Sequence, residues 1–288
     1  MTRRGFYLLT ENTFESCYFV SRFITALGHS SRFLGVLIAE PPPPPDLLLE
    51  REQFHSRHHR VYDWNEKLDQ MWSRLYQPLS PAGRRMIEAY GLPRYPNSQH
   101  DHTIFLGSDI NTASARHRME DLLRIDNRRW LVTYLPRMIQ PWLIELAHSQ
   151  VLNCHSAVLP YARGLHAIEN IAASRDIDAF RTAAGITIHY IDNGIDTGPI
   201  IRAERIVDPF RFDSLWDLKG HLYHTGVTWY IRTVRDIIES DDTVPAGIIP
   251  SAALKATTYY KTDFTPKKAR QAETGYLWMK SRLSSSGV

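Results

Sequence analysis

Cysteine is scarce in this sequence of 288 residues, which contains only Cys17 and Cys154. Two cysteines are too few for a framework of disulfides or for a zinc site built from cysteine thiolates. Such sparing use of cysteine fits a reducing compartment, so we predict a cytoplasmic protein.

Long apolar runs are also lacking. The N-terminal run at residues 6–9 is too short for the apolar core of a signal peptide. No stretch approaches the roughly 20 apolar residues that a transmembrane helix needs. The sequence therefore predicts no association with a membrane.

A large excess of one charge is missing as well. The net charge is +3, and the basic residues are scattered among acidic ones rather than gathered in a stripe. A dedicated nucleic-acid binder usually carries a concentrated basic face. We therefore expect no nucleic-acid partner.

The first strand is not followed by the glycine fingerprint of a dinucleotide-binding fold. Residues 5–9 predict a strand, residues 14–27 an amphipathic helix and residues 33–38 a second strand. This opening is typical of an α/β fold, with a Rossmann-like, mostly parallel sheet and helices on both faces. Because Gly-x-Gly-x-x-Gly is absent after the first strand, no nicotinamide cofactor is expected.

An enlarged helical insertion is expected at about residues 41–100. It opens with five prolines at 41–45, which predict an extended surface spacer, with a docking ligand as the less favoured alternative. Residues 47–60 predict a solvated helix face that carries three histidines without the carboxylate geometry of a metal site, so no metal is expected. Helices are predicted at 64–76 and 81–90, where an aromatic stripe forms either core or the wall of a substrate pocket.

The most informative stretch runs from residue 151 to residue 201. Alternate residues of an extended segment share a face, so Asn153 and His155 should project together while Cys154 points into the packing. A carboxamide and an imidazole side by side can both donate hydrogen bonds to a developing oxyanion. A β-branched strand at 185–191 then leads into a tight loop, from which Asp196 could reach His155. An isolated Asn-x-His is more often a turn, so the inference depends on the combination.

These motifs resemble those of the folate-dependent formyltransferases. The pattern Asn-x-His-Ser-x-x-Leu-Pro-x-x-x-Gly at 153–164 precedes Gly-Ile-Thr-Ile-His-Tyr-Ile-Asp-x-Gly-Ile-Asp-Thr-Gly at 185–198. The family includes glycinamide ribonucleotide, methionyl-tRNA and sugar N-formyltransferases. Compact members go from the second strand to the catalytic core in fewer residues, which marks the insertion at 41–100 as a departure.

The resemblance implies a cofactor and a set of site residues. The donor would be 10-formyl-tetrahydrofolate, a co-substrate, and the catalytic residues would be Asn153, His155 and Asp196. The loop after a strand at 130–134 would present backbone groups to the pteridine ring, although a plain turn before Pro141 is the alternative. The implied folate contacts in the two loops are Arg137, Met138, Ile139, Tyr190, Asp192 and Gly194.

The predicted function is that of an N-formyltransferase, which moves a formyl group to the amine of a small molecule through a tetrahedral intermediate. The acceptor would be an amino sugar nucleotide, an amino acid or a hydroxylamine. A formyl-tetrahydrofolate hydrolase is the alternative enzyme, because water could attack at the same site. A non-enzymatic interaction module is disfavoured by the intact catalytic trio, and a tRNA substrate by the short, weakly basic C-terminal portion.

The expected domains are a catalytic domain at 1–240 and a small C-terminal extension with a tail at 241–288. Within the first we also expect a strand at 103–107, a helix at 113–124, a strand at 200–207 and a helix at 214–239. Residues 257–266 resemble the segment that follows the catalytic domain in several family members, and residues 281–288 predict a loose tail. A homodimer is left open.

Overall fold

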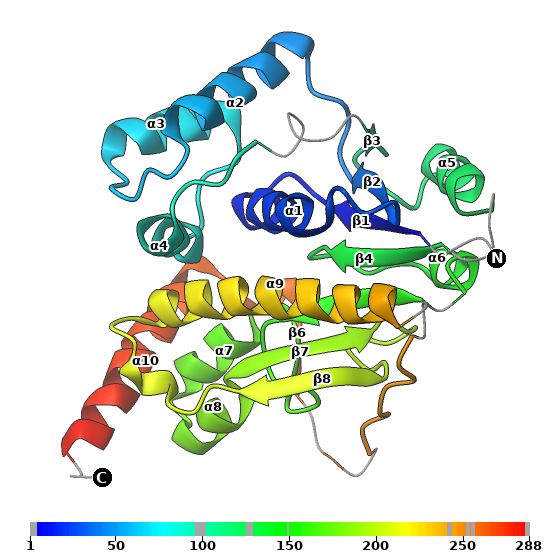
Figure 1. Cartoon of the computed structure of the whole chain (residues 1–288). Coiled ribbons are helices and arrows are strands. Elements are labelled where there is room, and N and C mark those ends of the chain that lie inside the picture. The colour runs from blue at the N-terminus through cyan, green and yellow to red at the C-terminus, as the bar shows by residue number, and fades with distance from the viewer. Residues whose placement is uncertain are drawn as a thin grey trace. The chain divides into compact units, whose positions relative to one another are not determined.

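The computed structural model describes residues 5–95, 102–124, 129–148, 150–240, 244–251, 254 and 257–285. The chain forms two compact units, and Figure 1 shows its helices and strands. One unit comprises Met1–Asn153 and Val227–Pro245, and the other comprises Cys154–Gly226 and Ala246–Val288. These boundaries differ from the expected division at residue 240, so the assignment of separate roles to 1–240 and 241–288 stays a prediction.

A parallel sheet forms the centre of the first unit. Its strands pair in parallel in the order β3 (Thr103–Phe105), β2 (Phe33–Ile38), β1 (Phe6–Thr10), β4 (Trp130–Tyr134) and β5 (Val151–His155). Strand β1 is buried along its whole length, as expected for a parallel strand covered on both faces. The predicted α/β class with a mostly parallel sheet is confirmed.

Helix α1 (Phe14–Leu27) follows the first strand where the sequence predicted it. The side chain of Thr13 accepts a hydrogen bond from a backbone N–H of the first turn, which satisfies a donor that would otherwise lack a partner. The apolar face of the helix packs through Phe19, whose ring stacks on Tyr134 at 5.2 Å and lies 5.8 Å from the ring of Tyr230. The spacing of the apolar residues and the Thr13 cap together explain why α1 forms here.

Three helices make up the predicted insertion, and Figure 1 shows them at its upper left, in light blue to cyan. They are α2 (Pro45–His58), α3 (Glu66–Leu75) and α4 (Pro81–Tyr90). The five prolines are not extended throughout, because Pro45 is already the first residue of α2. Proline is tolerated there since the first helical N–H has no partner within the helix.

The aromatic stripe of the insertion is core. The ring of Trp72 is completely buried and stacks on Tyr76 at 4.1 Å, and its indole N–H donates to the carbonyl of Gln77. Trp64 is also buried and donates to the carboxylate of Asp69. These rings fill the interior of the insertion, so the alternative that they line a substrate pocket is not supported.

His55 departs from the solvated helix face predicted for residues 47–60. It is completely buried, and its ring nitrogens lie 2.8 Å from the carbonyl oxygen of Pro93 and 2.9 Å from the hydroxyl of Tyr76. Burial lowers the pKa of His55 to about 4, which keeps the ring neutral. The polar sequence around it gave no sign of this burial, because the partners come from outside α2.

Helix α5 (Ala113–Arg124) and the long helix α9 (Leu215–Glu239) lie close to their predicted bounds, 113–124 and 214–239, whereas α6 (Pro141–Leu146) was not predicted. Helix α9 runs from the second unit into the first. The side chain of Ser214 accepts a hydrogen bond from the backbone N–H of Asp217 at 3.0 Å and so caps α9.

The second unit contains the last two strands of the sheet that includes β5, and a separate sheet of two strands. Strands β7 (Gly185–Tyr190) and β8 (Ile200–Arg205) pair antiparallel, while β6 (Ala162–Gly164) and β9 (Thr257–Tyr259) form a separate parallel pair. The helices of this unit are α7 (Ala167–Ser174), α8 (Ile177–Ala183) and α10 (Pro266–Ser285). The sequence predicted β7 and β8, the latter two residues too long, but not β6, α7, α8 or α10.

The predicted loose tail at 281–288 is wrong over its first part. Helix α10 continues to Ser285, and residues 286–288 lie outside the described residues. The helix is anchored through Tyr276, which is completely buried and donates its hydroxyl to the carbonyls of Pro209 and Phe212, both at 2.9 Å. Within the described part of the chain, no helix is both long and apolar enough to cross a membrane.

Candidate active site

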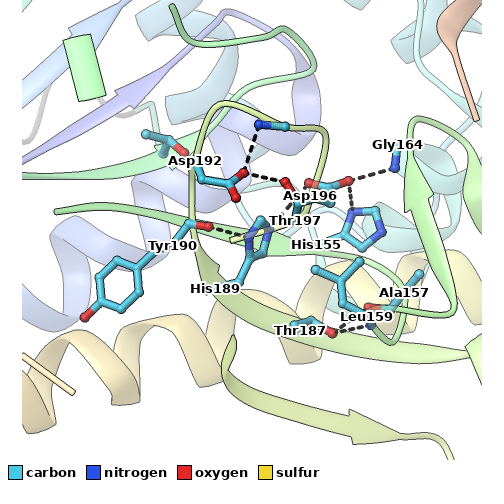
Figure 2. A network of polar contacts seen from close by, with 12 residues as sticks. His155, Ala157, Leu159, Gly164, Thr187, His189, Tyr190, Asp192, Asp196 and Thr197 are labelled. Carbon is cyan, nitrogen blue, oxygen red and sulfur yellow. Dashed lines mark hydrogen bonds and ion pairs between the residues drawn. The ribbon is translucent and has the colours of Figure 1, made fainter. Parts of the chain in front are cut away.

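His155 and Asp196 form a buried pair in the second unit. His155 ends β5, and Asp196 lies in the loop after β7. His155 Nδ1 is 3.4 Å from Asp196 Oδ2, and the two side chains are 10% and 15% exposed. Figure 2 shows the imidazole and the carboxylate directed at one another. The structure thus places together the two residues that the sequence proposed as partners.

The carboxylate of Asp196 has further partners. Oδ2 accepts a hydrogen bond from the backbone N–H of Gly164 at 2.7 Å, and Oδ1 lies 3.4 Å from Nε2 of His189. Burial would raise the pKa of Asp196, but the two imidazoles and the Gly164 N–H outweigh burial and hold this pKa well below its ordinary range. Asp196 therefore stays a carboxylate.

The ring of His155 is held from both sides. Nε2 lies 2.8 Å from the carbonyl oxygen of Ala162, and because a carbonyl only accepts, Nε2 carries a proton in this arrangement. Burial lowers the pKa of His155, and the charge of Asp196 opposes that effect only in part. The geometry thus presents a neutral imidazole whose Nδ1 faces a carboxylate able to stabilise a second proton.

The loop at 156–160 is fixed by a buried threonine of β7. Thr187 Oγ1 donates to the carbonyl of Ala157 at 2.8 Å and accepts from the N–H of Leu159 at 3.0 Å. Thr187 is completely buried, so this pair of bonds is shielded from water. Figure 2 shows the connection beneath the His155 side chain.

The loop at 191–198 is held by Asp192. Its Oδ1 accepts from the N–H of Gly194 at 3.0 Å and from the hydroxyl of Thr197 at 2.6 Å, an Asx turn. Within this loop Asp196 has φ 50°, and Gly194 is not among the residues with positive φ. The left-handed residue of this loop is therefore Asp196 rather than Gly194.

The other residues predicted from the sequence are found as follows. Tyr190 ends β7, is buried, and in Figure 2 its ring points away from Asp196. Asn153 is the third residue of β5, where it pairs with Thr133 of β4. Cys154 Sγ packs near Gly226 of α9, and burial raises its pKa to about 12, so the thiol stays protonated.

The loop at 137–139 belongs to the first unit. Arg137 donates to the carbonyl of Ser108 at 2.9 Å and pairs with Glu11 at 3.2 Å, while Met138 is 55% exposed and Ile139 is buried. The guanidinium is therefore engaged by protein groups. The part of this loop that remains for a ligand is the backbone and the side chain of Met138.

Two features near the pair were missed by sequence reasoning. His189 lies in the motif at 185–198, yet only the structure shows it beside Asp196, with Nδ1 2.7 Å from the carbonyl oxygen of Tyr190. Lys219 donates to Ser156, the residue after His155, at 2.9 Å, and to Glu169 at 3.0 Å. The position of His189 within the motif is the signal that could have indicated the first feature, whereas no spacing in the sequence indicates the second.

Part of the chain is similar to known proteins. Residues 127–234 match the family model described as formyl transferase. Phosphoribosylglycinamide formyltransferase of Bacillus subtilis (strain 168) is 30% identical over 105 residues, which are 35% of this chain and 49% of that protein. The chain thus spans about half the length of this curated relative.

Solved structures agree in fold. A sugar N-formyltransferase from a Shewanella species has a TM-score of 0.53 at 9% identity, covering 95% of this chain and 88% of its own. An N-formyltransferase from Helicobacter canadensis, in complex with folinic acid and dTDP-3-aminofucose, has a TM-score of 0.51 at 13% identity, covering 94% and 80%. Residues 127–234 are thus similar to formyl transferases, and the predicted resemblance to that family is confirmed.

Proposed function

We propose that this chain transfers a formyl group from 10-formyl-tetrahydrofolate to the amine of a small molecule. The single observation that carries the proposal is the buried His155–Asp196 pair, with its atoms 3.4 Å apart, inside a formyl transferase domain. Formyl transfer needs attack by a neutral amine, stabilisation of a tetrahedral oxyanion, and movement of a proton from the attacking to the leaving nitrogen. A buried imidazole beside a carboxylate suits the last two tasks.

The roles follow from the groups present. The carboxamide of Asn153 donates to the oxyanion. His155 carries a proton on Nε2, now directed at the carbonyl of Ala162, and a second proton gained at Nδ1 would face the carboxylate of Asp196. Because 3.4 Å is longer than an ordinary hydrogen bond, protonation of His155 would draw this pair together. Asp196 thereby stabilises the imidazolium.

The folate contacts are proposed for two loops. Met138 and the backbone of 137–139 suit the edge of a heterocycle, since Met138 is exposed and Arg137 is already engaged. In the other loop the contacts are the backbone at Tyr190, Asp192 and Gly194, which the Asx turn keeps in one conformation. Support comes from the placement of both loops directly after strands, where open α/β sheets bind ligands.

The acceptor is proposed to be an amino sugar nucleotide, with amino acids and hydroxylamines as the other classes to be tried. The Helicobacter enzyme with dTDP-3-aminofucose, whose fold covers nearly all of this chain, supports sugars as the first group in a panel. The rings of Trp64, Trp72 and Tyr76 do not bear on this choice, because they are buried in the core of the insertion.

Tetrahydrofolate release is expected to depend on the acceptor. Water should be excluded until an amine binds, since premature hydrolysis consumes the donor. We therefore expect slow release from the donor alone and at least about a hundredfold faster release with the right amine, accompanied by a formamide product. The measurement follows absorbance of tetrahydrofolate with and without each amine. Rapid release without any amine, yielding free formate and unchanged by the panel, would identify a hydrolase instead.

Replacing Gly194 with valine is expected to weaken donor binding. A Cβ at this position would lie 2.0 Å from Thr197 Oγ1, the atom that donates to Asp192, so the loop would have to move. We expect the affinity for a reduced folate to fall about tenfold, or about 1.4 kcal/mol, measured by calorimetry. Asn193→Ala, at the exposed neighbouring position, is the control and should bind normally. Normal affinity of a folded Gly194→Val protein contradicts the assignment of this loop.

A further inference from the structure

Strand β6 (Ala162–Gly164) holds both members of the buried pair through its backbone. The carbonyl of Ala162 lies 2.8 Å from His155 Nε2, and the N–H of Gly164 is 2.7 Å from Asp196 Oδ2. Successive residues of a strand direct their backbone groups to alternate edges, so these two bonds leave β6 on the same edge. The position of one short strand therefore sets the positions of both side chains.

The opposite edge of β6 pairs with β9 (Thr257–Tyr259). Arg163 is the register partner of Thr258, and the N–H of Leu165 donates to the carbonyl of Tyr259 at 3.0 Å. Gly164 has φ 84°, and a Cβ there would lie 1.9 Å from the Tyr259 carbonyl oxygen. The absence of a side chain at Gly164 thus allows β9 to approach β6, while the N–H of Gly164 donates to Asp196.

The segment that contains β9 is anchored beyond the strand. The ring of Phe264 stacks on His166 with centroids 4.2 Å apart and an interplanar angle of 16°. His166 directly precedes α7, and α10 packs closely on that helix because a Cβ at Gly275 would lie only 2.0 Å from the Ala172 carbonyl oxygen. Together these contacts anchor the segment that follows β9 to the residues that follow β6.

We propose that β9 is a positioning strand, which holds β6 so that its backbone keeps His155 and Asp196 in the geometry needed for turnover. The inference rests on the proposed function and gives a role to the segment at 257–266, for which the sequence predicted none. A three-residue strand has few bonds with which to resist displacement, and within the described residues β6 pairs only with β9. Loss of that ladder should therefore release the imidazole and the carboxylate together.

The test compares two proline substitutions in the same strand. Tyr259→Pro removes the N–H that a parallel ladder directs at the Arg163 carbonyl, whereas the N–H of Thr258 points to the other edge, so Thr258→Pro is the matched control. Proline is tolerated in a strand where its nitrogen faces away from the partner. Tyr259→Phe shows whether the side chain matters separately.

Two measurements are made on each folded variant. The first is the proton NMR signal of the His155 Nε2–H, which is protected from exchange by the Ala162 carbonyl and can be read in the resting protein without substrate. We expect loss of that signal in Tyr259→Pro and its retention in Thr258→Pro and Tyr259→Phe. The second is turnover, where we expect kcat to fall at least about tenfold in Tyr259→Pro with little change in the KM for folate, since misplacing reacting groups by a fraction of an ångström has such a cost.

An unchanged His155 signal and an unchanged kcat in Tyr259→Pro would overturn the positioning role. Equal losses in Thr258→Pro would also overturn it, because they would show a general effect of proline. If Tyr259→Pro does not fold, Phe264→Ala decides, since it loosens the same segment without touching the ladder, and an unaltered His155 signal there counts against the proposal. Failure of the proposed function is distinguishable, because the wild-type protein would then transfer no formyl group while the NMR comparison still reports on β9.

Discussion

Replacing His155 with alanine is expected to lower kcat for formyl transfer at least about a hundredfold, the typical cost of a lost positioned acid-base group. Asn153→Ala and Asp196→Ala should each have a comparable effect. The first removes the proposed oxyanion donor, and the second removes the carboxylate that lies 3.4 Å from His155 and accepts the Gly164 N–H at 2.7 Å. Turnover is measured with saturating donor and amine, and circular dichroism checks that each variant folds.

Asp196→Asn separates charge from shape in the same experiment. Asparagine can still accept from the Gly164 N–H, but it lacks the negative charge that opposes burial and raises the pKa of His155. Without it, the pKa of His155 falls further below 6.5. In the proposed mechanism the imidazole takes the proton of the attacking amine and must be neutral to do so, so the acid limb of kcat/KM should move to lower pH in the variant. An unmoved limb, or near-normal turnover in His155→Ala, contradicts these roles.

Elements with local signals were predictable from the sequence. Helix α4 (Pro81–Tyr90) has the predicted bounds because its proline start and the Ser80 cap, which accepts from the Gly83 N–H at 2.8 Å, act within a few residues. Helix α10 has no comparable signal. Its buried face includes Gly275, a poor helix former whose presence is explained only by the close approach to the Ala172 carbonyl.

The site was predictable where side chains meet within the two motifs. The sequence indicated that Asp196 could reach His155, and the structure places them 3.4 Å apart. Backbone partners such as the carbonyl of Ala162 and the N–H of Gly164 could not be predicted, because every residue offers those groups. The conformation of the loop at 191–198 was equally hidden, since nothing local shows that Asp196 rather than a glycine takes positive φ.

Lys219 and Glu169 form a second pair, which the sequence did not predict. The two residues are 50 positions apart, and no motif connects them. Their charged atoms are 3.0 Å apart, and their side chains are 4% and 3% exposed. The ammonium also donates to Ser156 Oγ at 2.9 Å, and His166 Nδ1 lies 3.4 Å from the other Glu169 oxygen. The pair thus connects α9 and α7 to the residue that follows His155.

Lys219→Met is expected to destabilise the protein by about 3–5 kcal/mol, because it leaves the carboxylate of Glu169 buried without its lysine partner. The double variant Lys219→Met/Glu169→Gln should recover much of this loss, since no buried charge remains. Urea unfolding of the single and double variants measures the difference. Arg85→Met is the control, because its pair with Glu88 is exposed and should contribute less than about 1 kcal/mol. A Lys219→Met protein as stable as the control contradicts the assigned importance of the buried pair.

The same pair predicts how stability depends on pH. Burial would raise the pKa of Glu169, but Lys219 and His166 outweigh burial and lower it from 4.5 to about 2. A carboxyl whose pKa is lower in the folded state stabilises that state above its unfolded pKa, and this contribution disappears as the pH falls through the folded value. Wild-type protein should therefore lose about 3 kcal/mol between pH 4.5 and pH 2 through this group. The double variant lacks the titrating carboxyl, so its unfolding free energy should fall less over that interval. Parallel curves for the two proteins would show that Glu169 is not ionised in the folded state, because only an ionised, paired carboxylate produces the difference.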